Sequence, residues 1–498
     1  METELKFEID AECAAGLRLR LGLSGDGRRL RSVYYDTPDL ALKAEGFVLR
    51  VRHKGDGWVQ GIKKADRGRL FSRHEWETTL TSEALDFEAI DKTPLGKVLT
   101  AERRAALQAA FEVDVVRTQR DLDLDGAVIE VALDEGEVRA DGRRTPIHEI
   151  ELELKTGDPA ALFALARDLD CECMDLCFIT KSARGFALAA GEAPGAVGFR
   201  YPPLKPDQTA AEGFRAIAAA ALAQIAANAA VLRQHRNGEA LHQLRVGLRH
   251  LRSAISLFEP LISPGAVQGI KGDLRWLARA CDGARDLDVF MEGAFAEAAA
   301  AAPNTSGLTD LTLTLENRRN QAHVQARRDV GERRFRTLML ETAAWVEAGD
   351  WADDPERAGL RATELKPFAQ DLLERARHRV AKRAKALDAP DQAARHRLRV
   401  ACKTLRYAAA YFAPVFGNAE AARDYIRLAG EAQDVLGGLT DIVSSEALCA
   451  EMASGPNGAP AQPFAAGYLA GRLNAGEAAA LKASRKAVRK LLKSEPFW

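Results

Sequence analysis

The first residues of the chain place three charged side chains at alternating positions, in Glu2-Thr3-Glu4-Leu5-Lys6. Alternate residues of a β-strand point to one face, so Glu2, Glu4 and Lys6 would lie together. Carboxylates beside an ammonium group suit a divalent metal ion that holds a phosphate chain. A solvent-exposed first strand would explain the same charges. The five residues alone leave both interpretations open.

More charged residues alternate along the rest of the first 190 residues. Arg50 and Arg52 share a strand face, as do Glu149, Glu151 and Glu153. A sheet with so many charges on one face lies either flat against water or closed around a polar interior. Closure also removes the exposed edges, and an interior of cations with carboxylates at one place would hold a linear triphosphate and its metal. The other members of this set are Lys63, Arg73, Glu75, Glu77, Arg120, Glu130, Asp134, Lys155, Lys181 and Arg184.

The elements that must position these residues are short strands joined by turns. Gly-Asp-Gly at 25–27 and 55–57 and Asp-Gly at 125–126 and 141–142 indicate turns. We expect helical inserts at 101–110 and 159–169 and a Gly/Pro-rich linker at 191–206. The alternating or β-rich segments are 30–35, 47–52, 57–63, 73–79, 117–124, 127–134, 137–140 and 148–155.

The ordered set of motifs over residues 1–195 resembles the CYTH domain, the fold of the triphosphate tunnel metalloenzymes. The resemblance implies an antiparallel tunnel β-barrel of α+β class. The residues that carry it are Glu-x-Glu-x-Lys at 2–6, Tyr34-Tyr35-Asp36-Thr37, Leu49-Arg50-Val51-Arg52, Lys63, Ala132-Leu133-Asp134-x-Gly136 and Glu149-Ile-Glu151-Leu-Glu153-Leu.

The same resemblance implies roles for individual residues. Glu2 and Glu4 would bind Mg²⁺ or Mn²⁺, and Glu151 or Glu153 would complete the metal site. Glu2, Glu4 and Lys6 would form the catalytic set for phosphoryl transfer to water. Glu75 and Glu77 would hold a second metal or pair with neighbouring arginines. The phosphate contacts would come from Lys6, Arg50, Arg52, Lys63, Arg73, Arg120, Lys181 and Arg184. No Ser/His/Asp or Cys/His arrangement calls for covalent catalysis.

The chain from Thr209 onward has helical periodicity and contains an internal repeat. The segment His242 to Phe258 matches the segment His396 to Phe412 at a constant offset of 154. A second match, with a one-residue slip, pairs Arg285-Asp286-Leu287 with Thr440-Asp441-Ile442. We therefore expect two related helical units, at about 207–300 and 365–450.

Each copy of the repeat carries a basic stripe on one helix face. His242, Arg245, Arg249 and Arg252 fall within about 80° of the helix circumference, and Leu244, Leu248, Leu251 and Ile255 form the opposite, buried face. His396, Arg399, Lys403 and Arg406 reproduce the stripe. Few aromatic residues interleave with these cations, which disfavours single-stranded nucleic acid and leaves phosphate contact, as in inorganic polyphosphate.

These helices resemble the CHAD domain, a histidine-bearing helical domain found fused to CYTH domains, over about residues 207–498. The resemblance implies polyphosphate binding in a basic pore between two pseudo-symmetric helical bundles. Cys281-Asp282 departs from the family, which tends to show Leu-Gly there, as Leu436-Gly437 does. Asp286, Asp288 and Asp441 could bind metal, but pairing with arginine is the favoured role.

Composition agrees with a two-part chain. Residues 1–200 carry 29 Lys and Arg against 37 Asp and Glu, a net charge of −8, and residues 201–498 carry 41 against 34, a net charge of +7. With 47% hydrophobic and 28% charged residues the chain has the composition of a soluble globular protein. No apolar run reaches about 18 residues, so no membrane helix is expected. The seven cysteines are predicted to be buried or free thiols, because no fourth ligand joins Cys171, Cys173 and Cys177 in a zinc site.

The sequence thus predicts a cytoplasmic protein, with polyphosphate granules as a candidate location. Residues 1–190 would form the barrel domain, 191–206 the linker and 207–498 the helical domain. The expected function is metal-dependent hydrolysis of inorganic tripolyphosphate or a related triphosphate, with polyphosphate bound by the helices. The alternatives are a non-catalytic polyphosphate scaffold and an adenylate cyclase. The oligomeric state is not predicted.

Overall fold

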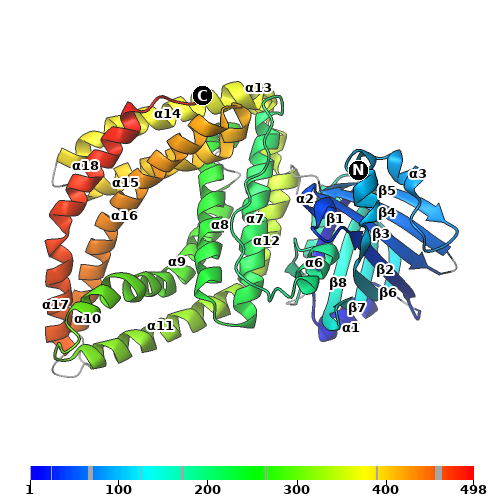
Figure 1. The fold of residues 1–498 in the computed structure, drawn as a ribbon, viewed down its shortest axis with the longest axis horizontal. Coiled ribbons are helices and arrows are strands. Elements are labelled where there is room, and N and C mark those ends of the chain that lie inside the picture. Colours follow the sequence, from blue (N-terminus) through cyan, green and yellow to red (C-terminus); the bar gives the residue numbers. More distant parts are fainter. Residues whose placement is uncertain are drawn as a thin grey trace. The chain divides into compact units, whose positions relative to one another are not determined.

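The computed structural model of the chain describes residues 2–23, 25–55, 57–65, 71–124, 126–169, 173–263, 265, 267–388, 391–454 and 462–498. Its contacts divide the chain into two compact units, coloured along the sequence in Figure 1. The first comprises Met1–Val197, Leu222–Val231 and Glu332–Gly349. The second comprises Gly198–Ala221, Leu232–Gly331 and Asp350–Trp498. The predicted domain boundaries stay predictions.

The first unit is built on one nine-stranded antiparallel sheet with strand order β5-β4-β3-β2-β6-β7-β8-β1-β9. A further pairing of β1 with β5 closes eight of these strands into a barrel, which confirms the predicted fold class. The strands are β1 Glu2–Glu8, β2 Arg28–Asp36, β3 Phe47–Lys54, β4 Gly57–Ala65, β5 Ser72–Leu80, β6 Gln108–Leu124, β7 Ala127–Ala140, β8 Arg143–Thr156 and β9 Asp175–Leu176.

Helices cover the barrel wall and one of its ends. Apolar residues such as Leu42, Leu49 and Ile90 form a core between strands and the short helices on the outer face. The helix α6 lies at one end, where Phe186 packs on Phe111 of β6. The approach is so close that a Cβ atom at Gly185 would lie 2.1 Å from the Phe111 ring. The helices of this unit are α1 Ala11–Arg20, α2 Ala41–Ala44, α3 Phe87–Asp91, α4 Ala101–Ala105, α5 Ala160–Asp168, α6 Lys181–Ala189 and α12 Arg333–Ala348.

The sequence located most of these strands and misjudged three features. The helix predicted at 101–110 ends at Ala105, and β6 already begins at Gln108. The segments 127–134 and 137–140 form one continuous strand, because Gly136 lets the strand pass close to its neighbour: a Cβ atom there would lie 2.1 Å from the Asp114 carbonyl oxygen. The helix α6, which carries two predicted site residues, was not predicted.

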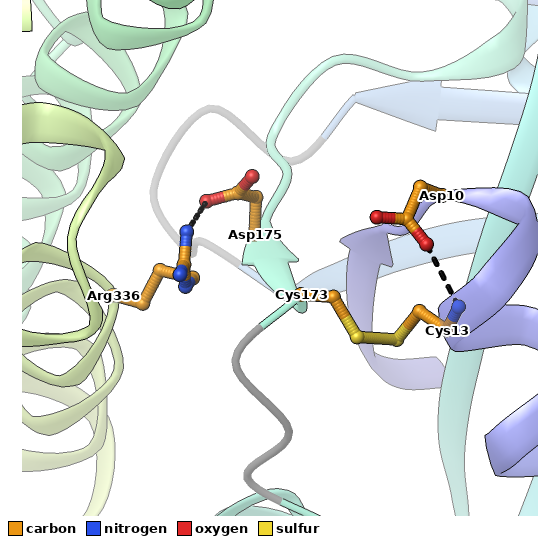
Figure 2. The surroundings of a disulfide bond; sticks show 5 residues. All are labelled: Asp10, Cys13, Cys173, Asp175 and Arg336. Atoms are coloured by element: carbon orange, nitrogen blue, oxygen red, sulfur yellow. Dashed lines mark hydrogen bonds and ion pairs between the residues drawn. A yellow bond between two sulfur atoms is a disulfide. The ribbon is translucent and has the colours of Figure 1, made fainter. Parts of the chain in front are cut away.

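A disulfide bond joins Cys13 of α1 to Cys173, just before β9 (Figure 2). The prediction of free thiols is therefore wrong for these two residues, because chain segments 160 residues apart meet beside the barrel. It is confirmed for Cys281, Cys402 and Cys449, which are free and buried, and Cys177 is free and half-buried. Cys171 lies outside the described residues.

Helix α12 packs on the first unit although its sequence lies between the two helical repeats. Arg336 of α12 lies 3.7 Å from the Asp175 carboxylate on β9 (Figure 2). Arg167 of α5 donates two hydrogen bonds, at 2.7 and 2.9 Å, to Glu341. These contacts attach α12 to the strand that borders β1.

The second unit is helical and shows the internal repeat in its core. The residues that end the two copies of the repeat, Phe258 and Phe412, are fully buried and their ring centroids lie 5.9 Å apart. The longer helices are α7 Ala210–Gln234, α8 Gly238–Leu257, α9 Gln268–Phe290, α11 Leu308–Gly331, α14 Leu365–Ala384, α15 Gln392–Phe412, α16 Ala419–Ser454, α17 Gln462–Ala475 and α18 Glu477–Lys493. Of these, α7 has its segment Leu222–Val231 in the first unit. Shorter helices are α10 Ala296–Ala301 and α13 Ala358–Ala362.

Helix α7 has the length and composition of a membrane-spanning segment. Its most apolar window of 18 residues has a mean hydropathy of 1.5, and 72% of that window is buried inside the protein. The core helix of a soluble protein has these same properties, so they are weak evidence for a membrane span. The predicted cytoplasmic location stays a prediction.

Candidate functional site

The interior face of the barrel gathers the predicted carboxylates and lysines. Strand β1 runs antiparallel to β8 in a register that sets Glu4 opposite Glu153 and Lys6 opposite Glu151. The Lys6 ammonium lies 2.7 Å from Glu151 Oε1 and 3.6 Å from Glu4 Oε1. Glu2 and Arg73 are paired in the register of β1 and β5, but their side chains lie outside the described part of the structure.

Helix α6 brings two further cations to the same carboxylates. The Lys181 ammonium lies 2.8 Å from Asp134 Oδ2, 2.5 Å from Glu149 Oε2 and 2.7 Å from Glu151 Oε1. Arg184, one turn later, contacts Glu149 at 2.5 Å and Glu8 at 3.0 Å. Burial disfavours the charged form of Lys181, yet Asp134, Glu151 and Glu149 raise its pKa well above the usual value. Lysine and carboxylates therefore stay charged together in the barrel interior.

Arg117 of β6 completes this network and was missed by sequence reasoning. Its guanidinium donates to both Asp134 oxygens, at 2.7 and 2.6 Å, and to Glu151 Oε2 at 2.5 Å. Arg120, which the sequence placed in the set, is exposed and donates to the Leu21 carbonyl oxygen at 2.9 Å. Positions 117 and 120 differ by three, so their side chains point to opposite faces of the strand.

A second group of cations lies on β3 and β4. Arg50 Nη2 lies 3.0 Å from Glu75 Oε1 and 3.6 Å from Glu77 Oε1. Lys63 Nζ lies 2.8 Å from Glu75 Oε2. Arg52 differs, because it makes no ion pair within the described residues and donates only to Ser32 Oγ, at 3.1 Å. Burial, together with the neighbouring Arg50 charge, lowers the pKa of Arg52 to about 10. An anion bound in the barrel interior would therefore stabilise the charge of Arg52 more than that of the already paired Arg50 and Lys63.

The donor atoms at the β1–β8 end fit a hard divalent cation. They are carboxylate oxygens, the ligands that Mg²⁺ and Mn²⁺ prefer. Glu4 Oε1 is buried and accepts no hydrogen bond from the residues that the structure describes. Among the described residues no three acidic, His or Cys side chains form a ready metal cluster. The residues present therefore fit a metal in chemistry, without forming a preassembled cage.

In the helical unit the two basic stripes face one another. Their buried sides are as predicted, because Leu244, Leu248, Leu251 and Ile255 are at most 2% exposed. Burial, and then Arg249, Arg399, Arg252 and Arg406, lower the pKa of Lys403 to about 8. The Nε atoms of Arg249 and Arg406 are buried and lack a hydrogen-bond partner within the described part of the chain. Cations of both copies of the repeat therefore lie close together, and two of their N–H donors are not used in hydrogen bonds with the described residues.

Acidic residues compensate only one end of the stripe. Arg245 is hydrogen-bonded to Asp282, in the dipeptide that departs from the family pattern, and lies 3.9 Å from Asp286. Asp288 is buried and contacts Arg319 at 2.6 Å and His323 at 3.0 Å. Pairing, favoured over metal binding for these aspartates, therefore accounts for Asp288.

Comparison with known proteins identifies matches for both regions. Residues 1–180 match the CYTH domain model and residues 216–450 match the CHAD domain model. An inorganic triphosphatase of Haemophilus influenzae is 30% identical over 199 residues, which are 38% of this chain and 55% of that protein. The chain thus spans about half the length of this curated relative.

Among solved structures, the CHAD domain of the plant Ricinus communis superposes with a TM-score of 0.51 at 28% identity. It covers 61% of this chain and 98% of that one. PptA from Streptomyces chartreusis gives a TM-score of 0.45 at 20% identity, with coverage of 57% and 100%. This second likeness is too distant to support a functional argument.

Proposed function

We propose, from the match of residues 1–180 to the CYTH domain and of residues 216–450 to the CHAD domain, that the chain hydrolyses inorganic tripolyphosphate or a related triphosphate. The observation that carries the proposal is a closed barrel whose interior holds Lys6, Arg50, Arg52, Lys181 and a row of carboxylates. A linear triphosphate matches this interior, because it needs cations along its length and a metal at one place.

The cations would bind the phosphate oxygens in two groups. Lys6 and Lys181 lie against the β8 carboxylates, and Arg50 and Arg52 come from β3. Arg52 has no carboxylate partner among the described residues, so it gains most from a phosphate. The guanidinium fork also suits bidentate contact with phosphate oxygens. These residues would orient the chain and stabilise the charge that develops on the leaving pyrophosphate.

Of the two carboxylates predicted to complete the metal site, Glu153 is the better candidate. Both Glu151 oxygens are engaged, Oε1 by Lys6 and Lys181 and Oε2 by Arg117. Glu153 lies directly opposite Glu4, and its close partner, Lys155 at 2.8 Å, is itself exposed. Glu4 and Glu153 would therefore hold Mg²⁺ or Mn²⁺. When bound, such an ion neutralises phosphate oxygens and lowers the pKa of bound water.

The helical unit would bind inorganic polyphosphate through the two stripes. The two stripes offer hydrogen-bond donors to an anion, namely the Nε atoms of Arg249 and Arg406, which bond to none of the described residues. Lys403 lies among arginines that lower its pKa, so an anion would also relieve their repulsion. A condensed phosphate supplies oxygen acceptors and negative charge at once. One chain would then both bind polyphosphate and carry the barrel that hydrolyses triphosphate.

The test is phosphate release from tripolyphosphate, ATP and long-chain polyphosphate with Mg²⁺ and with Mn²⁺. Glu4→Gln and Glu153→Gln should each lower kcat by roughly 100-fold or more and raise the metal concentration needed. Glu45→Gln, at an exposed carboxylate that makes no hydrogen bond or ion pair with the described residues, is the control and should leave activity unchanged. Tight polyphosphate binding without turnover would instead indicate a scaffold, and cyclic AMP with pyrophosphate would indicate a cyclase.

A further inference from the structure

A basic groove lies between α14 and α15, and the described residues that line it include no residue of the two stripes. Its volume is about 860 Å³. Five of its basic side chains come from two turns of α14 and one from the start of α15: they are Arg375, His378, Arg379, Lys382, Arg383 and Arg397. Among the described residues that line it, the one carboxylate is Glu374, which accepts a hydrogen bond from Trp498 Nε1 at 2.9 Å. Positive charge therefore dominates this groove.

Several of these basic side chains have no partner among the residues that the structure describes. Arg375 pairs with Asp371 at 2.7 Å, and Arg397 lies 3.4 Å from Asp391. His378, Arg379 and Lys382 are exposed and make neither a hydrogen bond nor an ion pair with any residue that the structure describes. An ordinary solvated helix face mixes both signs of charge. This face holds donors for an anion.

Comparison of the two repeats shows that the fold does not require these cations. The repeat offset of 154 aligns α14 with α7, as the buried pair Phe214 and Phe368 indicates. The α7 counterparts of the groove residues are neutral and buried, and one of them, Asn228, hydrogen-bonds the backbone of Val197. Those counterparts of Arg375, His378, Arg379 and Lys382 are Ala221, Gln224, Ile225 and Asn228. The basic groove thus belongs to the second copy only.

We propose that the groove is a second binding site for an inorganic phosphate chain, adjacent to the stripe on α15. The inference rests on the proposed polyphosphate binding by the helical unit and adds a separate site to it. His396 of the stripe and Arg397 of the groove are consecutive residues, about 100° apart around α15. A chain bound along the stripe therefore reaches the groove within one turn of this helix.

The lining selects a phosphate chain over nucleic acid. No Phe, Tyr or Trp side chain is among the described residues that line the groove, so bases would find no large aromatic surface for stacking. Arginine forks and a lysine suit phosphate oxygens, which repeat along a condensed phosphate without bases. The α14 cations extend over about 12 Å of helix. Two adjacent sites raise the affinity for a chain long enough to occupy both, and do nothing for tripolyphosphate.

The experiment compares two double variants of the full chain that carry the same change of charge. Arg379→Glu with Lys382→Glu removes the unpaired groove cations. Lys482→Glu with Lys486→Glu changes two exposed lysines of α18 outside the groove. We expect the groove variant to bind long-chain polyphosphate at least roughly tenfold more weakly, with a smaller dependence of affinity on salt. The control should stay within about twofold of the wild type, and both should hydrolyse tripolyphosphate at the wild-type rate.

Three results would overturn the inference. The groove variant could bind long-chain polyphosphate as tightly as the wild type, the control could lose as much affinity as the groove variant, or the groove variant could lose affinity for DNA but not for polyphosphate. A stripe variant, Arg249→Ala with Lys403→Ala, tests the proposed function separately. If it abolishes polyphosphate binding while the groove variant binds normally, the groove is not a site and the stripe is. Circular dichroism and thermal unfolding verify that each variant is folded.

Discussion

Replacing Lys403 with Met should stabilise the protein at pH 7 and weaken its binding of polyphosphate. Burial and four arginines lower the pKa of Lys403 from 10.5 to about 8. Each pKa unit corresponds to about 1.4 kcal/mol, so the charged lysine costs the folded state roughly 3 kcal/mol. Methionine keeps most of the packing of the lysine stem without the charge. The free energy of unfolding should rise by about 1–3 kcal/mol, and Tm by several degrees.

The pH dependence separates charge repulsion from packing. Between pH 8 and 10.5 the unfolded chain binds more protons at Lys403 than the folded protein, so wild-type stability rises with pH over this interval. Below pH 8 the lysine is charged in both states and the destabilisation is complete. The advantage of Lys403→Met should therefore be full at pH 7 and vanish above about pH 10.5.

The assay is urea unfolding at pH 7, 9 and 10.5, with isothermal titration of long-chain polyphosphate at pH 7. The control, Lys482→Met at an exposed position of α18, should change stability by less than about 0.5 kcal/mol. Loss of one charge-assisted contact should weaken polyphosphate binding roughly tenfold or more. If Lys403→Met destabilises the protein equally at all three pH values, the lysine has a packing role and the reasoning is wrong.

Three further outcomes follow from the barrel unit. Arg117→Met should lower stability by about 3 kcal/mol, because it removes one cationic partner of the buried Asp134 and Glu151 carboxylates, whereas Arg120→Met should change it by less than about 0.5 kcal/mol; urea unfolding compares them. Burial opposes the charge of Glu151, but neighbouring cations hold its pKa well below 4.5. The stabilisation from this carboxylate should therefore persist at neutral pH and be lost as the pH falls from about 4.5 toward the lowered pKa, which acid unfolding measures. A thiol reductant should lower wild-type stability by up to about 5 kcal/mol, since the disulfide closes a long loop, and should leave Cys13→Ser unchanged.

The sequence predicted the strands of the barrel better than the pairing between them. Alternation of charged residues located Arg50, Arg52 and the row Glu149 to Glu153. It carries no information on strand register, so the sequence predicted Arg120 as the phosphate-binding arginine of this strand, whereas Arg117 is the one in the barrel interior. A usable signal was present. The Asp-Gly pair at 125–126 predicts a tight turn in the sequence, and in the structure β6 pairs with β7 with Leu124 opposite Ala127, which sets Arg117 opposite Asp134. Hairpin geometry, applied strand by strand, would have found the missed arginine.

Other features could not be read from local patterns, because they depend on chain segments that meet only in the fold. Cys13 and Cys173 are separated by 160 residues, and nothing near either residue indicates the other. Helix α12 follows the first helical repeat in sequence, yet its Glu341 pairs with Arg167 of the barrel unit. Periodicity predicts such elements one at a time and leaves their partners open.

The two parts of the molecule treat positive charge in opposite ways. In the barrel, Lys6, Lys181 and Arg117 lie among carboxylates that keep them charged, so a substrate must compete with partners already present. On the facing stripes, Lys403 and Arg249 lie among cations and have their pKa values lowered, burial contributing first. A balanced interior favours a defined geometry and exchange of a short substrate together with its metal. An unbalanced surface gains free energy from any condensed anion, so it suits the retention of long chains more than selection among short ones.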